Sequence, residues 1–170
     1  MRLKAVVLAV LLFGTAAFCG DRGALPLLGH TEYVVVAAKD AAGKDVTFAT
    51  EAKIDTGADS AALHGLNVDR FRRGKRNWVR FTVATVDDQV VQLEAPLVKM
   101  VRVRSSNGER ARRYVVELQL CLGNRWVPVS VSLTDRSKMS CPLLLGQKFL
   151  SNRYLVDVGQ SHIQGKPSCP

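Results

Sequence analysis

Lys53-Ile54-Asp55-Thr56-Gly57-Ala58 is the most informative segment of this 170-residue chain. Asp-Thr-Gly makes an ordinary turn in many proteins, because Asp can cap backbone amides and Gly accepts a positive φ. A second segment narrows the interpretation. Pro142-Leu143-Leu144-Leu145-Gly146 is a short apolar run closed by Gly, and residues 147–150 after it are compatible with a helix. We expect a carboxylate on a tight turn, with a buried strand and a short helix far downstream.

These two segments, in this order, are typical of retropepsin-like aspartic peptidases. The chain also resembles a bacterial family of retropepsin-like proteins long labelled ATP-dependent zinc proteases, over nearly all of its length after the N-terminal segment. Residues 29–34, 53–64, 104–108, 132–139 and 143–146 carry this resemblance. One departure is Asp59-Ser60, where many relatives carry Arg-Thr. An ion-pair network of that family is therefore not transferred to this chain.

The resemblance implies an all-β fold, a retropepsin-like acid-protease half-barrel with one short helix after the Leu-Leu-Gly motif. It implies a catalytic Asp55, an active-site loop of Thr56, Gly57 and Ala58, and a supporting strand that ends in Leu145 and Gly146. Hydrolysis by this chemistry needs two carboxylates that share a proton, whereas Asp-Thr-Gly occurs once in the chain. We therefore predict an aspartic endopeptidase whose dyad is formed by Asp55 from two chains of a homodimer.

Other interpretations of the same residues stay open. Asp157, in Leu155-Val156-Asp157-Val158-Gly159, is the closest approach to a second motif, although a terminal strand at the dimer interface is the favoured explanation of this segment. The fold can also serve as a non-catalytic module that binds a peptide or an envelope protein, because fold does not determine function. A metal-dependent amidase is a third hypothesis, which sensitivity to chelators would distinguish.

The residues do not support the ATP and zinc of the family's label. ATP calls for a Gly-rich phosphate loop with Lys and Ser or Thr, and the chain has no such motif. Zinc hydrolysis calls for His-Glu-x-x-His or a similar cluster, whereas His30, His64 and His162 are far apart in the sequence. We predict no cofactor and no metal site, and we expect His64 on a helix or turn behind the active-site loop.

Apolar and polar residues alternate along several short segments, which predicts strands and very little helix. The expected strands are residues 33–38, 46–50, 79–86, 90–93, 97–103, 114–120 and 126–133, with Pro96 as an interruption. Asn107-Gly108 favours a hairpin turn, because both central residues of a type I′ turn need positive φ. We interpret this hairpin as a flap over the substrate, with Arg104, Ser105 and Ser106 as candidate substrate contacts.

The N-terminus has the layout of a secretory signal. Arg2 and Lys4 precede the apolar run 5–13, and small residues follow it. We predict a signal peptide over approximately residues 1–19, a peptidase domain over residues 20–170, and export to the periplasm in preference to a signal anchor. Phe18 before Cys19 argues against a lipoprotein. Loss of the signal would lower the formal net charge from +9 to about +7.

The remaining cysteines and the basic residues complete the sequence-based predictions. In an oxidising compartment we expect a disulfide between Cys121 and Cys141, which leaves Cys169 unpaired. Basic residues cluster within residues 70–80 and 102–113. Because an exported protein rarely meets nucleic acid, we predict no nucleic-acid partner. We expect a peptide or protein substrate, and an acidic envelope protein is a possible partner.

Overall fold

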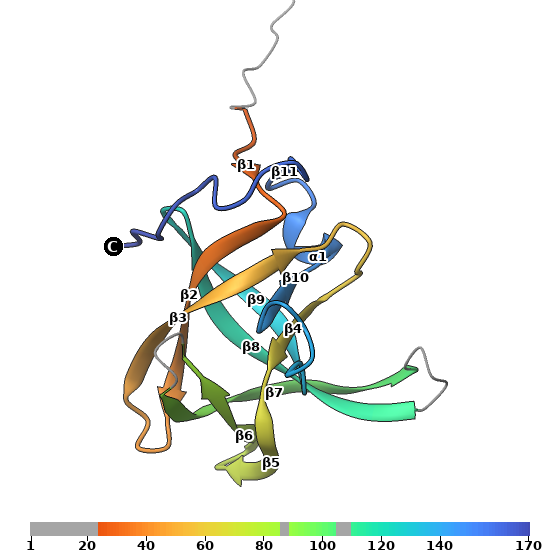
Figure 1. The fold of residues 1–170 in the computed structure, drawn as a ribbon. Coiled ribbons are helices and arrows are strands. Elements are labelled where there is room, and N and C mark those ends of the chain that lie inside the picture. Colours follow the sequence, from red (N-terminus) through yellow and green to blue (C-terminus); the bar gives the residue numbers. More distant parts are fainter. Residues whose placement is uncertain (1–23, 86–88, 105–109) are drawn as a thin grey trace, which may run out of the picture.

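The computed structural model describes residues 24–85, 89–104 and 110–170 (Figure 1). The predicted signal peptide lies outside these residues, as do Ser105 and Ser106 of the predicted flap. Within the described ranges, no helix has the length and apolar character needed to cross a membrane.

The regular secondary structure of the described chain is almost all strand. The strands are β1 (Leu27–Leu28), β2 (Thr31–Asp40), β3 (Asp45–Ile54), β4 (Ala61–His64), β5 (Leu66–Arg73), β6 (Arg76–Ala84), β7 (Val90–Arg104), β8 (Arg110–Leu122), β9 (Arg125–Thr134), β10 (Leu143–Leu145) and β11 (Leu155–Val156). The helix α1 spans Gln147–Leu150. The prediction of an all-β half-barrel with one short helix after the Leu-Leu-Gly motif is confirmed.

Nine strands form one sheet in the order β2-β3-β10-β4-β9-β8-β7-β6-β5. β2 also pairs with β8 and β7, so the sheet closes on itself into the ring seen in Figure 1. The short β10 lies between β3, to which it is parallel, and β4, to which it is antiparallel. β1 and β11 form a separate two-stranded sheet. Segments far apart in the sequence therefore meet at β10.

The core follows the two-residue period of the strands. Val34 and Val36 of β2 are fully buried, and Val79 and Phe81 of β6 face the same interior. Since successive side chains of a strand point to opposite faces, this alternation buries one face of each strand. Each such side chain contributes about 1.5–3 kcal/mol through removal from water.

The structure departs from the expected strands in three places. β7 is a single strand that continues through Pro96, and its pairing with β8 is irregular between Leu97 and Lys99. Proline is tolerated at such irregular positions because a ladder hydrogen bond is already missing there. Residues 66–73, which carry part of the first basic cluster, form β5. His64 lies at the end of β4 and not on a helix or turn.

A buried carboxylate fastens the C-terminal segment to the barrel. Glu32 on β2 has no exposed surface, and it accepts hydrogen bonds from the backbone amides of Gly29 (2.7 Å), Ile163 (3.1 Å) and Gln164 (3.2 Å). These bonds satisfy both carboxylate oxygens within the protein. Residues 160–165 are thus an ordered part of the fold.

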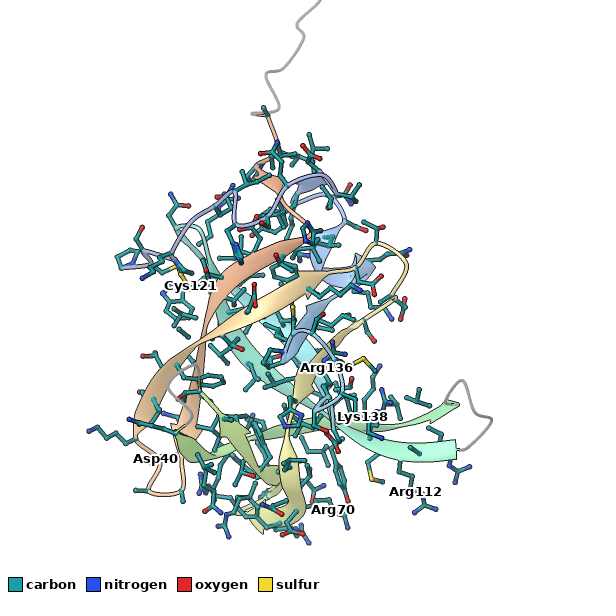
Figure 2. The ribbon with its side chains drawn as sticks, viewed as in Figure 1. Asp40, Arg70, Arg112, Cys121, Arg136 and Lys138 are labelled. Carbon is teal, nitrogen blue, oxygen red and sulfur yellow. A yellow bond between two sulfur atoms is a disulfide. The ribbon has the colours of Figure 1, made fainter. Side chains whose placement is uncertain are left out.

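The predicted Cys121–Cys141 disulfide is wrong. Cys121 pairs with Cys169, and Cys141 is a free, buried thiol. The reason is the path of the C-terminal segment, which returns to the turn between β8 and β9. The Ser168 amide donates to the Gly123 carbonyl (2.8 Å), and the Trp126 indole donates to the Pro170 carbonyl (3.1 Å). Figure 2 marks Cys121 beside this segment.

We expect Cys121→Ser to lower the free energy of unfolding by about 3 kcal/mol, because the bridge closes a long loop with a sequence separation of 48. Urea unfolding under non-reducing conditions measures this. Cys169→Ser should lower the free energy of unfolding by the same amount, and the double variant should lower it no further than either single change. Ser168→Ala, beside the bridge, should leave the midpoint unchanged. A single variant as stable as the wild type would contradict the pairing.

Candidate functional site

Asp55 directly follows β3, and its turn closes on its own side chain. One carboxylate oxygen, Oδ1, accepts hydrogen bonds from the amides of Gly57 (3.0 Å) and Ala58 (3.1 Å). The Asp55 amide donates to the Leu145 carbonyl on β10 (3.0 Å). These hydrogen bonds with the backbone of the turn and of β10 hold the half-buried Asp55 carboxylate in one orientation. The structure therefore brings the predicted Asp55 and Leu145 together.

The rest of the loop rests on the start of α1. The Ala58 carbonyl accepts from the Gln147 amide (2.7 Å), and the Gln147 side-chain amide donates to the Thr56 carbonyl (2.7 Å). Gly146 lies directly beneath, where an added Cβ would come within 2.5 Å of the Ala58 carbonyl oxygen. Only glycine leaves room for this contact. The predicted residues Thr56, Gly57, Ala58, Leu145 and Gly146 thus form one unit.

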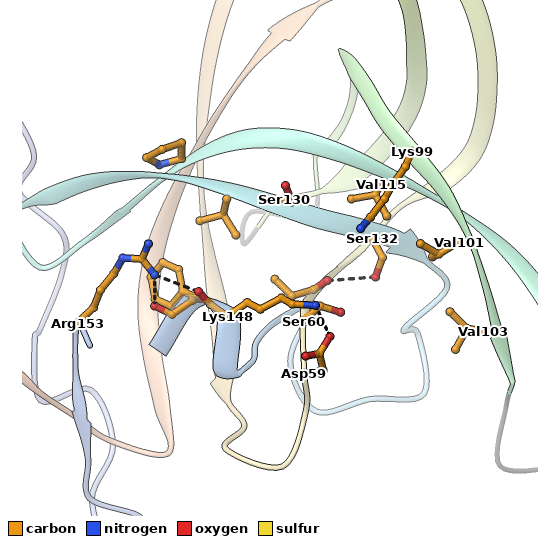
Figure 3. Close-up of a pocket in the computed structure, with 14 residues that line it drawn as sticks. Asp59, Ser60, Lys99, Val101, Val103, Val115, Ser130, Ser132, Lys148 and Arg153 are labelled. Carbon is orange, nitrogen blue, oxygen red and sulfur yellow. Dashed lines mark hydrogen bonds and ion pairs between the residues drawn. The ribbon is translucent and has the colours of Figure 1, made fainter. Parts of the chain in front are cut away.

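A cleft of about 420 Å³ opens beside this loop (Figure 3). Its walls come from the loop, from α1 and from strands β7, β8 and β9. Its apolar lining includes Val101, Val115 and Phe149, and its cationic side chains are Lys99, Lys148 and Arg153. Asp59 and Ser60 bring the loop to the cleft, whereas Asp55 stands outside its lining. Such an apolar floor with a few polar groups is typical of a ligand site.

The three cations of the cleft differ in their partners. Lys148 Nζ pairs with Asp59 Oδ2 at 2.6 Å. Arg153 Nη1 donates to the carbonyls of Lys148 (3.0 Å) and Phe149 (2.9 Å). Lys99 forms no ion pair with any residue that the structure describes, and Figure 3 shows its amine pointing across the cleft toward Ser132. Lys99 is the cation best placed to receive an acidic ligand.

The sequence-based predictions did not include Arg136, a further positively charged side chain on the Asp55 side of the site. Arg136 follows β9, its amide donates to His64 Nδ1 (2.8 Å), and its Nε donates to the Cys141 carbonyl (3.2 Å). Burial lowers the pKa of Arg136 most; Cys141 acts to raise it, the Arg113 guanidinium acts to lower it, and the Asp55 carboxylate makes the smallest contribution, which raises it. Arg136 lies in segment 132–139, which carried the resemblance, so a signal for it existed. Figure 2 labels Arg136 on the segment between β9 and β10.

Cys141 and Asp157 fit poorly as reactive groups. Burial raises the pKa of the Cys141 thiol, which keeps it protonated. Asp157 closes a turn of its own, because it accepts from the Gly159 amide (2.9 Å) and from the Gln160 side chain (2.9 Å). These bonds lower its pKa. The role of Asp157 in the fold is that of a turn cap.

The predicted flap contributes to the cleft through its strands. Lys99, Val101 and Val103 of β7 line the cleft together with Val115 of β8. Arg104 ends β7 opposite Arg110, and the turn with Ser105 and Ser106 lies outside the described residues. Substrate contact by these three residues stays a prediction. Within the described ranges, no group of three or more His, Cys, Asp or Glu side chains is arranged to hold a metal ion.

Three comparisons place this geometry among known proteins. Residues 29–167 match the RimB-like family, described as retropepsin-like aspartic endopeptidase RimB. A probable alpha-L-glutamate ligase of Parasynechococcus marenigrum is 34% identical over 120 residues, which are 69% of this chain and 26% of that protein. A ligase of the same name from Shewanella pealeana is 32% identical over 121 residues, with the same coverage. The chain spans about a quarter of the length of these relatives.

A solved structure supports the fold. A Legionella pneumophila protein of unknown function superimposes with a TM-score of 0.66 at 28% identity. The superposition covers 82% of this chain and 98% of that one. The retropepsin-like resemblance is confirmed by the family match.

The predicted function needs correction. An exported aspartic endopeptidase with a dyad of two Asp55 residues is contradicted by the curated relatives, which are named probable alpha-L-glutamate ligases. That prediction is wrong because it drew a function from a single loop motif, and such a motif indicates only a fold and the position of a carboxylate. It carries no information on the compartment or on the peptides that reach the cleft.

Proposed function

Because this chain belongs to the RimB-like family, we propose that it is an enzyme acting on glutamyl peptides, which it binds in the cationic cleft beside the Asp55 loop. An alpha-L-glutamate ligase, as its name says, joins L-glutamate to another molecule, and the product carries additional carboxylates. A protein segment shared with such ligases has access to that product. The relatives' names and the charge of the cleft support this substrate class.

Lys99 is the observation that carries the proposal. Its side chain borders the apolar part of the cleft, and it has no ion-pair partner among the described residues. A glutamate carboxylate beside this amine would gain a charge-assisted hydrogen bond. Lys148 and Arg153 add positive charge on the α1 side, and Arg136 adds it near Asp55. Clefts with charge of one sign concentrate ligands of the other.

The family's name supplies the reaction class of this proposal, the hydrolysis of a peptide bond. Asp55 is its reactive carboxylate: it takes a proton from the water that attacks the peptide carbonyl and returns that proton to the leaving amine as the C–N bond breaks. The Gly57 and Ala58 amides hold Oδ1, so the other oxygen, Oδ2, is the one left to face the substrate. A glutamyl side chain held at Lys99 would orient the peptide along the loop.

Digestion of matched peptides tests the proposal. An α-linked oligoglutamate peptide should be cleaved, whereas the same peptide with Gln in place of each Glu should be cleaved at least about tenfold more slowly, since it cannot pair with Lys99. A γ-linked oligoglutamate peptide of equal charge tests whether cleavage requires the α linkage between the residues. Equal cleavage of the Glu and Gln peptides would exclude the proposed substrate class.

We expect Lys99→Gln to raise KM for the α-glutamyl peptide about tenfold with little change in kcat, because the lost contact binds substrate and transition state alike. Steady-state kinetics on Glu and Gln peptides measure the effect. Lys166→Gln removes an equivalent charge from the exposed C-terminal segment and should leave KM unchanged. An unchanged preference for Glu in Lys99→Gln would exclude Lys99 as the glutamate contact.

A further inference from the structure

The hairpin of β5 and β6 carries a dense group of basic side chains. It forms the end of the molecule opposite β1 and β11 (Figure 1). Residues 69–80 include one acidic side chain, Asp69. The basic side chains of this hairpin are Arg70, Arg72, Arg73, Lys75, Arg76 and Arg80.

Two of these arginines stabilise the hairpin itself. Glu94 on β7 is 1% exposed, and its two carboxylate oxygens bind Arg73 and Arg80. Arg80 donates to Oε1 through both Nε (2.9 Å) and Nη2 (2.7 Å). The Arg73 guanidinium also stacks over Trp78, 4.6 Å from the ring centroid. These contacts fix the twist and position of β5.

The other four cations have no such partner. Arg70, Arg72, Lys75 and Arg76 are exposed, and none forms an ion pair with a described residue. Arg70 and Arg72 are two residues apart on one strand, so their side chains share a face of β5. Asp69, Phe71 and Arg73 occupy the opposite face. Figure 2 labels Arg70 at the lower end of the molecule.

β5 is also an edge of the sheet. Its one sheet neighbour is β6, paired from Leu66↔Thr82 to Arg73↔Arg76. No other described strand pairs with its second side. An edge of this kind presents a row of backbone donors and acceptors to which an extended peptide can add as a further strand. Its charge prevents pairing with a second copy of the same basic strand.

We propose that β5 docks an extended acidic segment of a partner polypeptide by strand addition. Carboxylates on alternate residues of that segment lie beside Arg70 and Arg72, as cross-strand neighbours do. This docking strand lies outside the cleft lined by Lys99, and it rests on the proposed function only in the choice of an acidic polypeptide as partner. Docking at β5 adds a second contact to the same partner polypeptide, which raises the effective concentration of that polypeptide at the cleft.

The observations favour a peptide over a nucleic acid. A phosphate backbone would use the arginines but would leave the edge amides and carbonyls of β5 unpaired. Arg73 and Arg80 also stack against Phe71, and Arg73 stacks against Trp78, so these rings are engaged within the protein. Binding of single-stranded nucleic acid relies on aromatic faces that bases can stack on.

Fluorescence anisotropy with a labelled ten-residue peptide of alternating Glu and Val tests the inference. Arg70→Glu combined with Arg72→Glu should weaken binding at least about tenfold, because attraction becomes repulsion at two positions. Arg125→Glu combined with Lys166→Glu makes the same change in net charge at exposed sites elsewhere and should leave Kd within about twofold. Equal weakening by both pairs would overturn the inference.

Three further measurements separate docking from other events. N-methylation of alternate peptide amides should abolish binding, because it removes the ladder hydrogen bonds; retained binding would overturn strand addition. A ten-nucleotide RNA that binds more tightly than the peptide would also overturn the inference. Lys99→Gln should leave docking unchanged while it raises KM. If Lys99→Gln abolishes peptide binding and the Arg70 and Arg72 changes do not, docking at β5 is excluded and the proposed function stands.

Discussion

Asp55→Asn is expected to lower the hydrolysis of α-glutamyl peptides by at least about 10³-fold, while the protein still folds. Asparagine keeps the side-chain oxygen that accepts from the Gly57 and Ala58 amides, so the turn survives. It cannot take a proton from water, so the general base is lost. The loss should appear in kcat, with little change in KM, since Lys99 still binds the peptide.

A matched control exists within the same chain. Asp157 closes a similar turn, in which Oδ1 accepts from the amide two residues later. Asp157→Asn therefore makes the same chemical change in the same local geometry and should leave kcat unaltered. Kinetic assays of both variants, together with their thermal unfolding, provide the comparison. Full activity in Asp55→Asn would move the chemistry to another residue, and loss of activity in Asp157→Asn alone would identify that residue.

Gly146→Ala is expected to destabilise the protein by about 2–3 kcal/mol, the cost of forcing an extra carbon into a packed site. The new Cβ would stand 2.5 Å from the Ala58 carbonyl oxygen and 2.8 Å from that of Ser60. Both are backbone atoms, so relief requires the loop to move. Such a shift would break the hydrogen bond from the Gln147 amide to the Ala58 carbonyl, and it would displace the Asp55 turn.

Urea unfolding and peptide kinetics together test this expectation. Gly57→Ala is the control for stability, because its Cβ would meet only the Asp55 side chain, at an ordinary 3.4 Å. We expect Gly57→Ala to change the free energy of unfolding by no more than about 1 kcal/mol. If Gly146→Ala is as stable and as active as the wild type, the close packing of the loop on α1 is not required.

Local patterns made the loop and the strands predictable. The Asp55 turn, the apolar run before Gly146 and the alternation in β6 and β8 are each read within a few residues, because strand period and turn chemistry are local properties. The half-barrel then followed from the resemblance. β5 was missed because its charged residues obscure the alternation of a strand that sits at an edge.

Contacts between distant segments were not predictable in this way. The Cys121–Cys169 bridge depends on where the C-terminal segment returns, and cysteine spacing does not determine connectivity. The burial of Glu94 between Arg73 and Arg80, and the position of Arg136 near Asp55, depend on which strands become neighbours. Glu94 on β7 pairs with Arg73 on β5 and with Arg80 on β6, and local spacing along the sequence carries no signal for such pairs.

The position of β10 between β3 and β4 determines when the Asp55 site can form during synthesis. Gln147, which holds the loop through the Thr56 carbonyl, is 91 residues further along the chain. At about 5–20 residues per second, a ribosome needs roughly 5–20 s to make the intervening segment. During that time the facing edges of β3 and β4 lack their shared partner. The nascent chain therefore carries two open strand edges and no completed site until β10 and α1 emerge.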